Sequence, residues 1–145
     1  MLISNCRKSG SETIENWSGG LITKPGTYEP VGTKNTITVW IDEEQLVRYS
    51  IANAGGKVVI ASTERPSVYS NWFAYFDFNG WLWFESGDIG VSVLRKDEDG
   101  IYEEIPIIDQ EDLIRAMPEE FFKRLPQSTE KMEAISNLRA NTDRK

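Results

Sequence analysis

The sequence predicts an α+β protein, in which an antiparallel β-sheet is followed by short helices. Apolar and polar residues alternate in short stretches across residues 36–108, and turns containing glycine or acidic residues separate these stretches. Residues 109–140 change to helical spacing. We expect a β-meander or half-open barrel of six to seven strands, followed by two to three short C-terminal helices. A β-sandwich with appended helices is the alternative.

The first 35 residues differ from the rest of the chain. Residues 1–35 are rich in Ser, Gly, Thr, Asn and Pro, and their apolar residues follow neither the strand period nor the helical period. We therefore expect an irregular leading arm over 1–35, contributing at most one edge strand, and a single α+β domain over 36–145. The length of 145 residues is typical of one domain.

The only cysteine is Cys6, so the chain can form no intramolecular disulfide. A short apolar run precedes Cys6 and a polar stretch follows it, which resembles the end of a bacterial lipoprotein signal. The basic segment and most of the apolar segment of such a signal are absent. We expect a cytoplasmic location, with an envelope tether through Cys6 as the alternative.

The β-rich part begins with three stretches of strand character, at residues 36–41, 46–52 and 57–61. The acidic run at 42–44 and the glycine-containing run at 53–56 separate them. Because these connections are short, we expect consecutive strands to pair as an antiparallel meander. No internal repeat is evident.

The strongest local signal is Asn79-Gly80, which lies between the aromatic stretches 72–78 and 81–85. Asn-Gly favours a two-residue type I′ hairpin turn, because both of its central residues need positive φ. Such a turn pairs Phe78 with Trp81 and sets the register of the whole hairpin.

This register divides the aromatic residues between two faces. The purely apolar face is expected in the core and consists of Phe76, Phe78, Trp81 and Trp83. The other face lies either beneath the helices or open as a binding surface and consists of Phe73, Tyr75, Asp77, Leu82 and Phe84.

Two further strands are expected at residues 91–95 and 101–108, on either side of the acidic loop 97–100. This loop does not fit the ligand spacing of an EF-hand, so we expect a surface hairpin turn there. The helical part is expected to contain a helix that Asp109 caps and Pro118 ends, and a later helix that Ser128 caps.

The composition argues against several classes of function. The chain has no histidine, which excludes His-based triads and nearly every zinc geometry, and it has no phosphate-binding loop. The formal net charge is −7, and the acidic excess lies in residues 36–108. A negative surface repels nucleic acid and anionic membranes. We expect no cofactor, no metal, no nucleic-acid partner and no transmembrane segment.

Three functional hypotheses remain, and whether the protein is an enzyme stays open. We favour a non-enzymatic acidic module that binds another, basic protein, such as an inhibitor or immunity-type protein. The alternative is a small-ligand or glycan-binding domain that uses the aromatic hairpin, with an envelope lipoprotein as one form of it. The least favoured hypothesis is a hydrolase that uses Glu85 and Asp88.

The candidate binding residues come from the second aromatic face and from the acidic strands. They are Phe73, Tyr75, Asp77, Phe84, Glu98, Asp99, Glu103 and Glu104. An exposed edge strand is equally suited to forming a homodimer.

Overall fold

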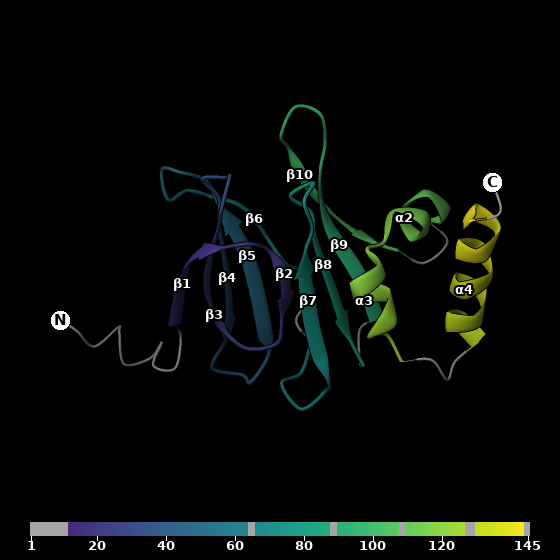
Figure 1. The fold of residues 1–145 in the computed structure, drawn as a ribbon. Helices are drawn as coiled ribbons and strands as arrows, with labels where there is room; N and C mark the ends of the chain where they lie inside the picture. Colours follow the sequence, from purple (N-terminus) through teal and green to yellow (C-terminus); the bar gives the residue numbers. More distant parts are fainter. Residues whose placement is uncertain (1–11, 64–65, 88–89, 108–109, 127–129, 144–145) are drawn as a thin grey trace.

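The computed structural model describes residues 12–63, 66–87, 90–107, 110–126 and 130–143, which form two five-stranded sheets and three helices (Figure 1). Sheet A contains, in spatial order, β1 (Glu12–Trp17), β3 (Gly26–Pro30), β4 (Thr36–Ile41), β5 (Val47–Ala52) and β6 (Val58–Ala61). Sheet B contains β10 (Tyr102–Pro106), β9 (Gly90–Lys96), β8 (Leu82–Ser86), β7 (Trp72–Phe76) and β2 (Gly20–Ile22). The helices are α2 (Glu111–Ala116), α3 (Glu119–Lys123) and α4 (Glu130–Asp143). The predicted α+β class is confirmed.

The region predicted to be β-rich contains the expected number of strands. Seven strands, β4 to β10, lie within residues 36–108, and each pairs antiparallel with its neighbours in the sheet. They divide into two meanders, β4 to β6 in sheet A and β7 to β10 in sheet B. The expected strand count and the late helices are therefore confirmed, and the two-sheet arrangement corresponds to the sandwich alternative.

The prediction of an irregular leading arm over 1–35 is wrong for the part that the structure describes. The segment from residue 12 to residue 30 contains β1, β2 and β3. β1 pairs parallel with β3 in sheet A, whereas β2 pairs antiparallel with β7 in sheet B. Each of these strands is short and consecutive strands belong to different sheets, which explains why no continuous period is visible in the sequence. Cys6 lies outside the described residues.

The two sheets pack face to face around the larger hydrophobic core. Side chains from both sheets are buried there, including Val39, Tyr49 and Ile51 of sheet A and Phe84 and Leu94 of sheet B. The rings of Tyr49 and Phe84 stack at 4.3 Å between centroids. The Tyr49 hydroxyl also lies 3.2 Å from the Ser92 hydroxyl, so a hydrogen bond crosses the core. These contacts make the fold a sandwich.

The helices cover the second face of sheet B (Figure 1). Trp83 of β8 is fully buried there against Phe121 of α3, with 5.9 Å between ring centroids. Arg139 of α4 donates hydrogen bonds to the carbonyl oxygens of Ile114 and Met117, at 3.2 and 2.8 Å. The molecule therefore has three layers, in the order sheet A, sheet B and helices.

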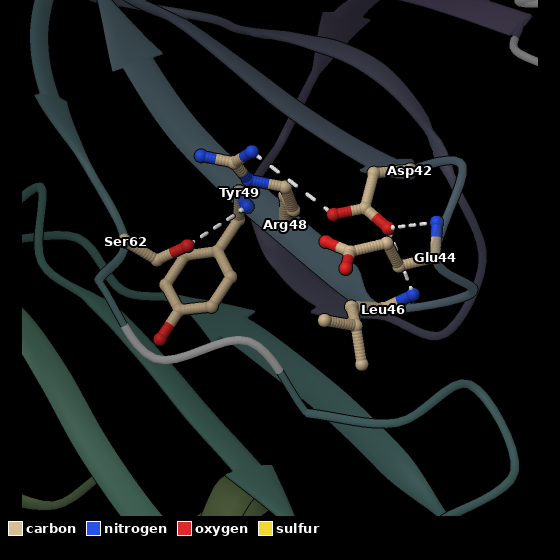
Figure 2. A network of polar contacts seen from close by, with 6 residues as sticks. All are labelled: Asp42, Glu44, Leu46, Arg48, Tyr49 and Ser62. Carbon is tan, nitrogen blue, oxygen red and sulfur yellow. Dashed lines mark hydrogen bonds and ion pairs between the residues drawn. The ribbon is translucent and has the colours of Figure 1, made fainter.

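Within the residues that the structure describes, one turn geometry recurs in four hairpins, although the sequence showed no evident repeat. In each, the side-chain oxygen of an Asp or Asn accepts hydrogen bonds from the backbone N–H groups two and four residues later, and the first residues of these turns are Asp42, Asn53, Asp77 and Asp97. Figure 2 shows the β4–β5 turn, one of the two examples in sheet A, where Asp42 Oδ1 accepts from the N–H groups of Glu44 and Leu46 at 2.9 and 3.1 Å. The residue three positions after the first has positive φ in every case, namely Gln45, Gly56, Gly80 and Gly100. This short Asx-capped turn sets the hairpin registers.

The predicted register of the aromatic hairpin is wrong by one residue. Asp77 pairs with Trp81, since the Asp77 N–H donates to the Trp81 carbonyl at 3.0 Å, and a three-residue loop at 78–80 connects them. The Asp77 side chain stabilises this longer turn by accepting from the Asn79 and Trp81 N–H groups, at 2.8 and 3.0 Å. A shift of one residue exchanges the faces of the second strand.

The faces of the hairpin are consequently regrouped. Ala74, Phe76, Leu82 and Phe84 face sheet A, and Phe73, Tyr75, Trp81 and Trp83 pack on the helix side. Phe78, which was predicted to lie in the core, is 98% exposed because it occupies the turn.

Candidate functional site

The connections of the sandwich gather at two ends. Since β1, β3, β5, β7 and β9 run in one direction, the connections that follow them lie at the same end, which is uppermost in Figure 1 and is called the upper end below. The β9–β10 turn projects furthest there. Loops positioned by a rigid scaffold are the usual carriers of binding residues.

Exposed apolar side chains are concentrated at the upper end. Phe78 lies in the β7–β8 turn, Val31 follows β3, Val58 begins β6 and Ile101 ends the β9–β10 turn, and all four are more than half exposed. Such side chains are unfavourable in water and are enriched where proteins make contacts. The upper end is therefore the first candidate for a binding surface among the described residues.

A cavity of about 810 Å³ opens at the same end. Its walls come from the β1–β2 connection, the end of β3 and the segment after it, the β7–β8 hairpin, the end of β9 and the α2–α3 junction. The lining residues are Ser18, Gly19, Gly20, Pro30, Val31, Gly32, Thr33, Tyr75, Phe76, Asp77, Phe78, Asn79, Gly80, Lys96, Ala116, Pro118 and Glu119. The cavity thus combines bare backbone, an exposed aromatic ring and few charged groups.

The charged groups of the cavity differ in whether they have partners. Glu119 accepts a hydrogen bond from Arg139 at 2.9 Å, and the buried Asp77 carboxylate accepts from the Trp83 indole N–H at 2.9 Å. Lys96 forms no ion pair with any other residue that the structure describes. Its ammonium lies against Gly80, 3.0 Å from the position that a Cβ would take there. Lys96 is therefore available to a ligand.

Tyr102 connects the two turns next to the cavity. Its hydroxyl donates a hydrogen bond to the Gly80 carbonyl at 2.7 Å, which holds the β7–β8 turn against β10. Burial raises the pKa of the Tyr102 hydroxyl above its ordinary value, so the hydroxyl stays a neutral donor at physiological pH.

The structure separates the aromatic residues that the sequence predicted to bind. Phe84 is 2% exposed in the sandwich core, so its prediction as a surface residue is wrong. Phe73 is half-buried and contacts Phe121 of α3, and Asp77 is buried as the cap of its turn. Tyr75 is half-buried and, like Asp77, lines the cavity. Register and the helical layer decide these positions.

The structure also places the predicted acidic residues in different positions. Glu98 and Asp99 are exposed in the β9–β10 turn. Glu103 is exposed on β10 and accepts a hydrogen bond from Arg95 at 2.8 Å. Glu104 points to the opposite face, where its Oε1 accepts from the N–H and hydroxyl of Thr63, both at 2.8 Å. The acidic candidates therefore form no single patch.

The remaining predictions concern catalysis, metal binding and dimerisation. Glu85 is buried at 6% exposure, and Asp88 lies outside the described residues, so the proposed carboxylate pair has no described geometry. The acidic loop at 97–100 is a surface hairpin turn, as predicted. Within the described ranges, no three potential metal-ligating side chains come together. A homodimer through an edge strand stays a prediction.

Several residues of the cavity were not singled out from the sequence. Lys96 lies far along the chain from Val31 and Gly32, and no spacing connects it with them. Among the lining segments, the sequence singled out the aromatic hairpin alone, which supplies Tyr75 and Phe78.

No family model, no curated protein and no solved structure matches this chain. Among the helices that the structure describes, none is both long and apolar enough to cross a membrane. Function is therefore inferred from the geometry of the upper end.

Proposed function

We propose that this protein is a binding module that recognises another, basic protein through the upper end of its sandwich. The observation that supports this most directly is the β9–β10 turn, which projects beyond the other connections (Figure 1). It presents the exposed apolar side chain of Ile101 beside the exposed carboxylates of Glu98 and Asp99. Apolar anchors bordered by charged groups are typical of protein interfaces.

The turn is held in one conformation before any partner binds. Asp97 Oδ1 accepts hydrogen bonds from the N–H groups of Asp99 and Ile101, at 2.8 and 2.9 Å. The Asp97 N–H donates to the Ile101 carbonyl at 2.9 Å. A preorganised turn loses little conformational entropy on binding, which favours affinity.

The charge of this turn suits a basic partner. Neither Glu98 nor Asp99 forms an ion pair with another described residue, so their negative potential extends into solvent. The net charge of −7 has the same sign. Complementary charges accelerate association and are screened by salt.

The test uses the whole chain as bait in an extract of its source organism, followed by rate measurements on the purified partner. Glu98→Lys with Asp99→Lys should slow association of a basic partner at least about tenfold at low salt. Glu43→Lys with Glu44→Lys is the matched control, because these residues take the same positions in the Asp42 turn. Ile101→Ser should mainly accelerate dissociation.

Two results would contradict the proposal. Equal slowing by the two charge-reversal variants would show that only net charge matters. If the association rate changes neither with salt concentration nor with the substitutions at Glu98 and Asp99, the interface lies elsewhere.

A further inference from the structure

We propose a second binding site in this protein: the cavity at the upper end takes a neutral saccharide, a hydroxyl-rich ring with one apolar face. This site is distinct from the protein-binding turn, although the two share the upper end. Five separate segments line the cavity, and four of its properties support the proposal: its size, its aromatic wall, its polar groups and its charge.

The size and walls of the cavity suit a small ligand. Its volume of about 810 Å³ lies within the usual range of ligand pockets. Gly20 and Gly32 both have positive φ, and no atom lies within 4 Å of the position that a Cβ would take at either residue. Bare backbone therefore borders open space, and a ring can approach it closely.

Phe78 provides the apolar platform. Its side chain is 98% exposed and lines the cavity, while the Asp77 side chain and the Tyr102 hydroxyl fix the turn that carries it. An exposed aromatic ring on a fixed turn can cover the C–H face of a sugar ring without a rearrangement of the turn. Val31, which is 61% exposed, adds apolar surface on another wall.

Polar side chains of the cavity lining match the hydroxyl groups of a sugar. The Lys96 ammonium is a donor, the Asn79 amide both donates and accepts, and the Thr33 hydroxyl does the same. A ligand rich in hydroxyl groups satisfies all three kinds of group, since each of its hydroxyls also donates and accepts.

Charge discriminates against ionic ligands. The negative net charge and the lining carboxylates of Asp77 and Glu119 oppose an anion. The Lys96 ammonium in the wall opposes a cation, since Asp77 and Glu119 already have the partners Trp83 and Arg139. A neutral ligand meets neither penalty. This combination favours a saccharide over a carboxylate or an amine of similar size.

The experiment titrates the ¹⁵N-labelled full chain with cellotriose, maltotriose and N-acetylated chitotriose and follows the backbone amide resonances. At least one of the three should produce saturable shifts at residues 31–33 and 78–80, at concentrations up to about 10 mM. Phe78→Ala should weaken this binding at least about tenfold, and Phe78→Tyr should restore it.

Matched variants separate the loss of a specific sugar contact from a general effect of the substitution. Tyr69→Ala removes an aromatic side chain that is 85% exposed outside the cavity lining and should leave binding unchanged. Lys96→Met, which keeps the aliphatic stem, should weaken binding, while Lys57→Met should not.

Three outcomes would overturn the inference: no saturable shift with any of the three sugars, binding that Phe78→Ala does not affect, or tighter binding of sodium benzoate. The paired change of Glu98 and Asp99 to Lys should leave sugar binding unchanged. Failure of the protein-binding proposal and failure of the saccharide site are therefore distinguishable.

Discussion

The two sheets of this protein have similar strands but different surroundings. In sheet A, burial alternates along β4, because one face meets sheet B and the other is open to solvent. In sheet B, all five residues of β8 are buried, since sheet A covers one face and the helices cover the other. Alternation thus identifies an outer layer, and continuous burial identifies the middle layer of a three-layer fold.

The difference is clearest for two tryptophans. Trp40 lies half-buried on the open face of sheet A, with the Arg48 guanidinium 5.7 Å from its ring centroid. Trp83 is fully buried between sheet B and α3, and its indole N–H donates to Asp77 at 2.9 Å. The same residue type therefore contributes very different amounts to stability in the two sheets.

The largest expected effect on the free energy of unfolding comes from removing the Trp83 side chain, and Trp40 provides the comparison. Trp83→Ala should reduce the free energy of unfolding by about 3–5 kcal/mol, because it leaves a large cavity and an unpaired Asp77 oxygen. Trp40→Ala should reduce it by about 1 kcal/mol or less. Urea unfolding measures both, with Trp83→Phe as a milder variant in case the alanine protein does not fold. Similar losses for Trp40→Ala and Trp83→Ala would disprove the layer assignment.

The Asx-capped turns should likewise contribute more to stability in sheet B than in sheet A. Asp77→Ala removes the acceptor of three N–H groups, one of them the buried Trp83 indole, and should cost about 2–3 kcal/mol. Asn53→Ala removes the acceptor of two N–H groups in an exposed turn of sheet A and should cost about 1 kcal/mol. Thermal unfolding of both variants measures the difference, and equal losses would show that the helix side adds nothing to the turn.

Because of Tyr102, the stability of the protein should depend on pH in the alkaline range. Burial raises the pKa of Tyr102 in the folded protein above the ordinary 10.0. Its contribution to stability is therefore fully present below about pH 10 and is lost as the pH rises towards the folded pKa. Tyr102→Phe should cost about 1 kcal/mol at neutral pH through the lost bond to Gly80. The deficit should shrink above about pH 10.

Urea unfolding between neutral and alkaline pH measures this change. Tyr69→Phe, which removes an exposed hydroxyl, is the control. A deficit for Tyr102→Phe that is constant across the range would contradict the role given to burial.

The smallest effect concerns Gln45, the non-glycine residue among the four positive-φ positions of the recurring turns. Its φ is 65°, whereas Gly56, Gly80 and Gly100 have values of 82–83°. Gln45→Gly should stabilise the protein by up to about 1 kcal/mol, because glycine avoids the steric cost of this conformation. The melting temperature measures the change. A loss of stability would show that the Gln45 side chain makes a compensating contribution.

Local signals in the sequence were sufficient for part of this structure. Stretches of strand character and the turn residues between them located β4 to β10, and Pro118 correctly marked the boundary between α2 and α3. The register of the aromatic hairpin was wrong because Asn79-Gly80 has a competing local signal in Asp77, whose side chain closes a longer turn. Two overlapping turn signals differ by too little energy for composition alone to decide between them.

By itself, the sequence determined the fold class, the strand count after residue 36, the late helices and the negative charge, because these depend on local periodicity and on side-chain chemistry. The tertiary structure alone decided that β1 to β3 divide between two sheets, that Phe84 is core and that Phe78 is exposed. It also brought Lys96, Gly32 and Tyr75 to one cavity. Pairing between distant strands and the covering of sheet faces are non-local, so no short stretch of sequence contains them.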